Sequence, residues 1–266
     1  MKPRNLVISL VLLAFGAGAQ TLEFNKPEDW NWNKGAFNDG ILTYQDQWRI
    51  VSSTLMKIEP TAQYKLRLEV RGPATPSKPL TMLAGYAVYD ADKREIQPYE
   101  VIYVKGTETE LTAPAAVGDT VLHLKDASKW RKGGALSIAF NAKEDLTDLP
   151  NRDVMIGNIR DIAAQGGSYD LLLKEPMKKA WPAGTRVRQH IYSSPLYVLL
   201  GPVPAEWKKM SGSLSGISDG KTPNHTGKWW PGSVYFRPSL HVSPKTKDTV
   251  EWKDIAVEVK KQDDIF

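Results

Sequence analysis

The sequence predicts an all-β fold, a jelly-roll-type β-sandwich that is interrupted by a small β-rich inserted subdomain. Residues 64–71 alternate apolar and charged side chains with a period of two, which is typical of a half-buried antiparallel strand. Gly, Pro, Asn and Asp separate many such short runs. No segment combines a helix-length apolar stripe with capping signals, so strands are expected nearly throughout.

The first 19 residues are predicted to be a cleaved signal peptide. Lys2 and Arg4 precede an apolar run over residues 6–15, and small residues at 17–19 offer a cleavage site before Gln20. The apolar run is too short for a membrane anchor, and no Cys follows it to carry a lipid. We therefore expect a secreted or periplasmic protein with no membrane anchor. The alternative is a buried N-terminal core helix.

Short strand-like runs recur along the mature chain. The runs lie at residues 48–58, 64–71, 84–89, 100–104, 120–124, 169–174, 186–191, 197–200, 234–242 and 250–260.

Residues 106–191 have the character of a separate unit. Hairpin-type turns at 118–119, 133–134 and 182–184 divide this stretch, and strand-like runs at 101–103 and 191–192 flank it and could pair at its neck. We therefore predict a discontinuous sandwich made of residues 20–105 and 192–266, with residues 106–191 inserted. The alternative is one continuous, larger β domain.

Charge and cysteine content exclude several classes of protein. The 266-residue chain has 35 basic and 30 acidic residues, and removal of residues 1–19 leaves 33 basic and 30 acidic ones. The basic residues are scattered, whereas a nucleic-acid partner requires a concentrated basic face, so none is expected. The absence of Cys excludes disulfides and Cys nucleophiles.

The order of the segments carries a resemblance to a known family. The chain runs through IVSSTLMKIEPTAQYKLRLEVRG, GYAVYDADKREIQP, EWKKMSGSLSG, YFRPSLHVSP and VEWKDIAVEV. This resembles carbohydrate-binding-module-like domains with a galactose-binding jelly-roll fold, found in bacterial secreted proteins and in some phage tail proteins. The segment AAVGDTVLHLKDASKW … WPAGTRV also looks like an insertion seen within relatives. These motifs are structural, and they indicate the fold more than the function.

The resemblance also implies a structural Ca²⁺ that joins the first strand to the last. Glu23, Asp254 and Glu258 are the oxygen donors that it nominates. Ca²⁺ takes six to eight oxygen ligands, and the sequence shows only these few. The alternative is three ordinary surface carboxylates.

Signals for catalysis are lacking. The four His, at 123, 190, 225 and 241, are dispersed, and Leu214 stands where a G-x-S-x-G motif would place its Ser. Asp90 and Asp92 lie in a predicted hairpin turn, where Asp favours the backbone geometry. A second set of carboxylates is expected to form a solvated loop: Glu144, Asp145, Asp148 and Asp153.

Tryptophans in loop-like segments are the strongest functional signal. Trp stacks on the flat C–H face of a sugar while amide and guanidinium groups bind its hydroxyls. The predicted glycan-binding set consists of Trp229, Trp230, Trp30, Trp32, Asn224, His225 and Arg237. The alternative is that these rings pack loops onto the core. Trp48, Trp207 and Trp252 lie in strand-like positions and are expected to pack.

The sequence therefore favours an exported, non-catalytic carbohydrate-binding protein whose partner is a poly- or oligosaccharide. One alternative is a structural or adhesive envelope protein that binds other proteins. A second is a glycan-active enzyme, for which no acid–base pair can be identified from spacing alone.

Overall fold

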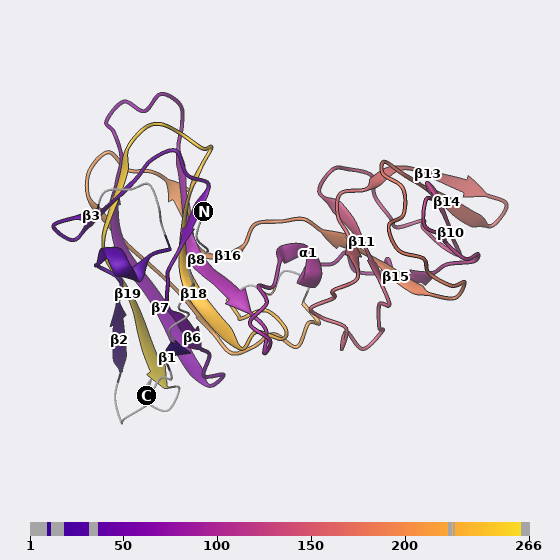
Figure 1. The fold of residues 1–266 in the computed structure, drawn as a ribbon, viewed down its shortest axis with the longest axis horizontal. Helices are drawn as coiled ribbons and strands as arrows, with labels where there is room; N and C mark the ends of the chain where they lie inside the picture. The colour runs from indigo at the N-terminus through magenta and orange to yellow at the C-terminus, as the bar shows by residue number, and fades with distance from the viewer. Residues whose placement is uncertain (1–9, 12–18, 32–36, 223–224, 226, 262–266) are drawn as a thin grey trace, which may run out of the picture.

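The computed structural model describes residues 10–11, 19–31, 37–222, 225 and 227–261, and its architecture is an all-β sandwich, as predicted. Two lobes follow one another along the long axis of the molecule (Figure 1). The larger lobe is a sandwich of two six-stranded sheets, and the smaller contains a three-stranded and a four-stranded sheet. All described strands of the smaller lobe lie between residues 109 and 191.

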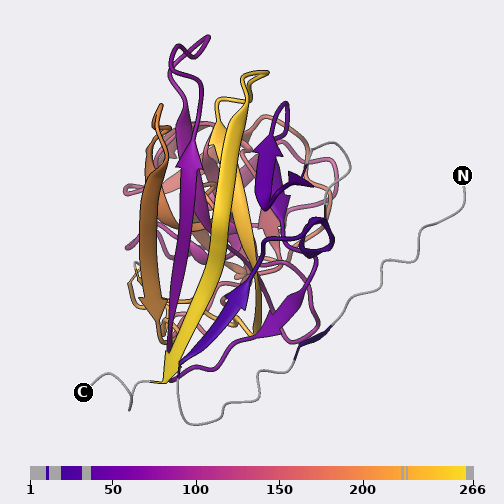
Figure 2. The ribbon, with the colours of Figure 1, turned by 90° about the vertical axis from the view of Figure 1, so that its left-hand side faces the viewer.

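The two sheets of the sandwich are named after their central strands. The β18 sheet has the order β1 (Leu10–Val11), β6 (Leu55–Lys57), β18 (Tyr235–Ser243), β8 (Thr81–Tyr89) and β16 (Leu196–Pro202), and β5 (Arg49–Val51) also pairs with β18. The β7 sheet has the order β17 (Lys208–Ser215), β7 (Ala62–Arg71), β19 (Val250–Lys261), β4 (Ile41–Tyr44) and β3 (Phe37–Asn38), and β2 (Gln20–Glu23) also pairs with β19. Figure 2 shows the long β7 and β19, purple and yellow, side by side.

Alternation along β7 fixes which of its faces is buried. Every second residue from Ala62 to Val70 faces the core, and the residues between them are half-buried, as the sequence predicted. Trp252 and Val257 of β19 are also fully buried. Between them, Asp254 adopts a positive φ of 50° at a register shift, so a bulge re-phases the strand. The hydrophobic effect of these opposed apolar faces holds the sandwich together.

The smaller lobe has a core of its own. One sheet joins β10 (Val121–Leu124), β14 (Ser168–Leu173) and β13 (Ile159–Gln165) in that order. The other joins β12 (Val154–Met155), β11 (Leu136–Phe140), β15 (Arg186–Ile191) and β9 (Thr109–Glu110). Their buried apolar residues form a cluster separate from that of the sandwich.

The chain enters the smaller lobe through a helical turn where a strand was expected over residues 100–104. The turn, α1 (Pro98–Val101), begins with a Pro, and the Gln97 amide donates to the Glu100 carboxylate at 2.7 Å. Pro at the first helical position and a carboxylate that binds an N-terminal amide both favour a helix start, and they override the apolar run that follows. Beyond it, the Ile191 amide donates to the Ile102 carbonyl at 2.9 Å, so the two flanks of the lobe do pair.

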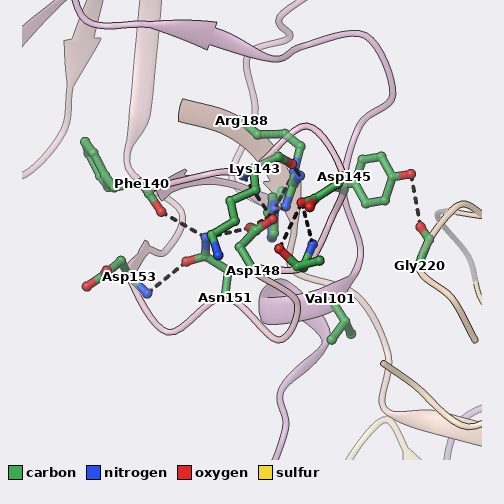
Figure 3. A network of polar contacts seen from close by, with 12 residues as sticks. Val101, Phe140, Lys143, Asp145, Asp148, Asn151, Asp153, Arg188 and Gly220 are labelled. Atoms are coloured by element: carbon green, nitrogen blue, oxygen red, sulfur yellow. Dashed lines mark hydrogen bonds and ion pairs between the residues drawn. The ribbon is translucent and has the colours of Figure 1, made fainter. Parts of the chain in front are cut away.

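A buried polar network fills the base of the smaller lobe (Figure 3). Arg188 is fully buried and donates to the Asp148 carboxylate at 2.7 Å. Asn151 Nδ2 donates to Asp148 and to the Phe140 carbonyl, each at 2.9 Å. The prediction of a solvated acidic loop is therefore wrong for Asp148, because its counter-ion comes from a strand 40 residues later in the chain.

Other contacts attach this base to the sandwich. Arg152 donates to Asp90 and to Glu100, each at 2.6 Å. The Tyr103 hydroxyl donates to the Gly220 carbonyl at 3.1 Å. Because both partners of Arg152 precede the smaller lobe in sequence, the ion pairs fix the lobe against the neck.

Within the described part of the chain, no helix has the length and apolar character needed to span a membrane. Leu10 and Val11, which belong to the predicted signal peptide, pair in parallel with β6. Cleavage before Gln20 remains a prediction, and it would remove β1.

Candidate functional site

The described tryptophans of the predicted glycan-binding set are buried. Trp229 and Trp230 are 0% and 2% exposed, and Trp30 is also in the core. The Trp229 ring lies 4.9 Å from that of Tyr86 and 5.0 Å from that of Phe236. The Trp229 amide donates to the Gly216 carbonyl, so this loop turns inward. The three rings therefore pack the core, which is the alternative that the sequence left open, and in this structure they offer no face to a sugar.

The polar members of that set are dispersed. His225 is buried, with Nδ1 2.7 Å from the Ser218 hydroxyl and Nε2 2.9 Å from the Val101 carbonyl. Trp32 and Asn224 lie outside the described residues. Arg237 lies on β18 and projects from the side opposite Phe236, against which the Trp229 ring packs.

The carboxylates nominated for Ca²⁺ do not form a suitable donor set. Among the described residues, no three His, Cys, Asp or Glu side chains form a group that could hold a metal ion. Glu258 instead pairs with Arg67 at 3.0 Å and with Lys65 at 3.9 Å. Glu23 is exposed, and the Asp254 carboxylate sits at the bulge of β19. These residues therefore do not fit a six- to eight-coordinate ion.

Asp90 has the turn role that the sequence predicted. Its carboxylate accepts from the Arg94 amide at 2.9 Å and also pairs with Arg152. These contacts hold the pKa of Asp90 below its usual value, against the opposing effect of burial. A carboxylate held in this ionised state by two arginines is a poor general acid.

The face of the β18 sheet that points away from the core brings a different set of polar and aromatic residues together. Along β18, Phe236, Leu240 and Val242 point into the core. Because side chains alternate along a strand, Arg237, Ser239 and His241 project from the opposite side. This surface, here named the β18 face, consists of Trp48, Arg49, Glu95, Tyr197, Arg237, Ser239 and His241. In Figure 1, β8, β16 and β18 lie on the side of the sandwich nearer the smaller lobe.

Trp48 is the exposed aromatic ring of this face. It is 62% exposed, so the expectation that it packs is wrong. Its ring centroid lies 4.4 Å from that of His241, which therefore supports one side of the indole. His241 Nδ1 is in turn 2.8 Å from the Tyr197 hydroxyl. The indole thus contacts one neighbouring ring and has much of its surface open to a ligand.

The close approach of two strands places Tyr197. A Cβ on Gly85 of β8 would come within 2.2 Å of the Leu196 carbonyl oxygen, so only glycine lets β16 lie this close. From there Tyr197 reaches across β8 to His241 on β18. Burial raises the pKa of Tyr197 to about 12, so its hydroxyl stays protonated at neutral pH.

An ion pair lies beside the rings of Trp48 and His241. Arg49 lies opposite His241 in the β5–β18 register and pairs with Glu95 at 2.7 Å. Burial and the nearby Arg49 lower the pKa of His241 to about 4, so the imidazole is neutral at pH 7. Tyr192, stacked on Tyr99 at 5.8 Å and 53% exposed, adds a second open ring at the neck.

The β18 face also has buried polar atoms that lack hydrogen-bond partners within the protein. Arg237 Nε, Ser239 Oγ and His241 Nε2 are all enclosed and unpaired. Most buried polar atoms in proteins are satisfied, so three alternate residues of one strand that share this property mark an unusual surface.

The smaller lobe has a concave site with a volume of about 390 Å³. Its aromatic wall is Trp181, whose ring stacks on Phe140 at 4.8 Å and is covered by the Lys179 ammonium at 4.2 Å. Both faces of this indole are therefore occupied, in contrast to Trp48. The β18 face is consequently the stronger candidate for a site that stacks on a planar apolar surface.

The remaining two tryptophans with predicted packing roles differ. Trp252 is fully buried, as expected. Trp207 is half-buried between Arg71 and Lys253, whose cationic groups lie 4.6 and 4.5 Å from its ring.

No protein-family model matches this chain, and no curated protein sequence matches it significantly. Among solved structures, it is similar to a lectin from Bauhinia forficata in complex with GalNAc, with 10% identity and a TM-score of 0.28, over 92% of this chain and 100% of the lectin. It is also similar to winged bean acidic lectin complexed with methyl-α-D-galactose, with 13% identity and a TM-score of 0.29, over 91% of this chain and 99% of that lectin. Both scores mark a weak similarity, so the function of this chain has to follow from its own residues.

Proposed function

We propose that this protein binds carbohydrate through the β18 face, with Trp48 as the stacking ring. The observation that carries the proposal is an indole that is 62% exposed and that contacts the His241 ring at a centroid distance of 4.4 Å. A sugar presents an apolar C–H face that can stack on such a ring.

Polar groups around the ring support the same function. The Arg49–Glu95 pair provides donors and an acceptor beside Trp48, and Tyr192 provides a second open ring. A small number of placed polar groups around an apolar surface is the usual composition of a ligand site.

We further propose that binding is not followed by catalysis and that the protein acts after export. Glycoside hydrolysis usually requires two carboxyl groups that flank the scissile bond. At the β18 face, Glu95 is engaged by Arg49, and Asp90, which follows β8, is engaged by Arg94 and Arg152. The predicted signal peptide supports export.

A glycan array with the chain from Gln20 onward tests the proposal, with Trp48→Ala and Trp207→Ala alongside the parent. We expect a saccharide signal that Trp48→Ala abolishes and Trp207→Ala retains, because Trp207 directly precedes β17 of the other sheet and its ring contacts two cations. Loss of the signal in Trp207→Ala alone would place the site on the β7 sheet. No signal from the folded parent would favour the alternative of a protein-binding envelope component.

A further inference from the structure

Arg237 is a buried arginine without a counter-ion. Its side chain is only 7% exposed, and among the described residues it has neither an ion pair nor a hydrogen bond. Its guanidinium lies over the Tyr89 ring, whose centroid is 5.3 Å from the guanidinium carbon. Burial of an unpaired charge is strongly unfavourable, so this arrangement needs a reason.

Neighbouring arginines have counter-ions, so the lack of one is specific to Arg237. Three other arginines on this side of the sandwich and at the neck have carboxylate partners within 3.0 Å. They are Arg49 with Glu95, Arg94 with Asp90, and Arg152 with Asp90 and Glu100. Carboxylates are therefore available in this region, and none is directed at Arg237.

The orientation of Arg237 suits a planar anion. An arginine stacked over a ring leaves the edge of its guanidinium free, and that edge binds a carboxylate through two parallel hydrogen bonds. Nε is enclosed and unpaired. The terminal nitrogens also have no hydrogen-bond partner among the described residues.

The spacing along β18 relates Arg237 to the stacking ring. His241, which supports Trp48, lies four residues further along the strand, or about 13 Å at about 3.3 Å per residue. A ligand that reaches from the Trp48 ring to Arg237 has to be longer than a single sugar ring. Ser239, which is fully buried and has an unpaired hydroxyl, lies between them along the strand.

We propose that the carbohydrate bound at the β18 face is acidic, an oligosaccharide of the uronic-acid class whose carboxylate pairs with Arg237. The inference rests on the proposed carbohydrate-binding function and adds the chemical class of the ligand. Arg237 is then a specificity-determining residue, since the carboxylate provides the counter-ion that the protein itself does not.

The test is an array of uronic-acid oligosaccharides, each printed beside its methyl ester and beside a sulfated neutral oligosaccharide of the same length. The proteins are the parent, Arg237→Gln, Arg237→Lys and Lys209→Gln. The Lys209 side chain is 87% exposed on the β7 sheet. Lys209→Gln removes the same formal charge as Arg237→Gln, so it is the matched control. Hits are then titrated at low and high salt.

We expect the parent to prefer one acid over its methyl ester by about ten-fold or more, because a charge-assisted bidentate contact is lost on esterification. Arg237→Gln should bring that ratio close to one, Arg237→Lys should retain part of it, and Lys209→Gln should leave it unchanged. Higher salt should reduce the preference.

Stability gives a second readout that does not depend on finding the right sugar. Arg237→Gln should fold with a thermal midpoint equal to or above that of the parent, since it removes an unpaired buried charge. A large fall in the midpoint would show that Arg237 is a structural residue and would overturn the proposal.

The outcomes separate the two proposals. Binding of neutral sugars without preference for any acid, an equal response to acid and ester, or an acid preference that survives in Arg237→Gln would overturn the acidic class and leave carbohydrate binding intact. A preference for the sulfated probe over every carboxylate would overturn the uronic-acid assignment. No saccharide bound by the folded parent would overturn both.

Discussion

Trp229 provides a sharp test of the distinction between core packing and sugar binding. Its ring is fully buried and contacts the rings of Tyr64, Tyr86 and Phe236 at centroid distances of 4.9–5.1 Å. Truncation of a buried Trp to Ala typically lowers the free energy of unfolding by about 3–5 kcal/mol. For a chain of this size we expect Trp229→Ala to lower the thermal midpoint by about 10 °C or more.

A conservative variant isolates the packing contribution. The indole Nε1 of Trp229 is buried without a hydrogen-bond partner. Trp229→Phe retains a ring against the same neighbours and removes this unpaired donor. It should therefore lower the free energy of unfolding by less, about 1–2 kcal/mol. Urea unfolding followed by circular dichroism measures both variants, and a saccharide titration below the transition measures binding.

The reasoning would be refuted by one combination of results. If Trp229→Ala were as stable as the parent but no longer bound the saccharide, the ring would be an exposed ligand contact. We expect the reverse, with stability lost and the affinity of the folded fraction preserved.

Three further predictions follow from the buried polar groups and the close strand contact. Arg188→Met should lower the free energy of unfolding by about 3–5 kcal/mol, because it leaves the buried Asp148 carboxylate without its partner; urea unfolding measures this, and a variant as stable as the parent would contradict it. Burial lowers the pKa of His190 to about 3 and that of His241 to about 4, from 6.5. The unfolded state therefore takes up protons first, and the free energy of unfolding should fall as pH drops from about 6.5 toward 4. Urea unfolding at pH 7 and pH 4.5 checks this, and a His190→Gln variant should show a shallower pH dependence. Gly85→Ala should displace β16 and weaken both stability, by about 1–3 kcal/mol, and saccharide affinity, through the position of Tyr197; an unchanged affinity in this variant would mean that Tyr197 does not position the site.

The strands could be predicted because their signal is local. The alternation of residues 64–71 assigns each side chain to one face of β7 without knowledge of its neighbours. The same holds for the all-β class, which follows from many such runs and the turn residues between them. The helical turn α1 was missed because the apolar residues that follow Pro98 also suit a strand.

The candidate site could not be predicted because its members come together only in the fold. Trp48, Tyr197 and His241 precede or lie on three different strands, and their contacts depend on the order of the β18 sheet. The Gly and Pro around Trp229 correctly indicated a loop, but they do not determine whether that loop turns toward solvent or toward the core. Asp148 was misjudged for a related reason, since its partner Arg188 is distant in sequence.

Arg237 was included in the predicted binding set as a neighbour of the Trp229 loop. In the structure it belongs to a different surface, since it projects from β18 on the side opposite Phe236. The lack of a partner for its guanidinium has no sequence signal, because it depends on where every nearby carboxylate points.

The most direct test of carbohydrate binding at the β18 face is the affinity of Trp48→Ala for the saccharide that the parent binds, measured by calorimetry beside Trp207→Ala. The loss of a central stacking ring should cost about 2 kcal/mol or more, which corresponds to an affinity about 30-fold weaker, with an unchanged thermal midpoint because the ring is exposed. Trp207→Ala should bind as the parent does. Equal affinity of Trp48→Ala and the parent would contradict the assignment of the site to the β18 face.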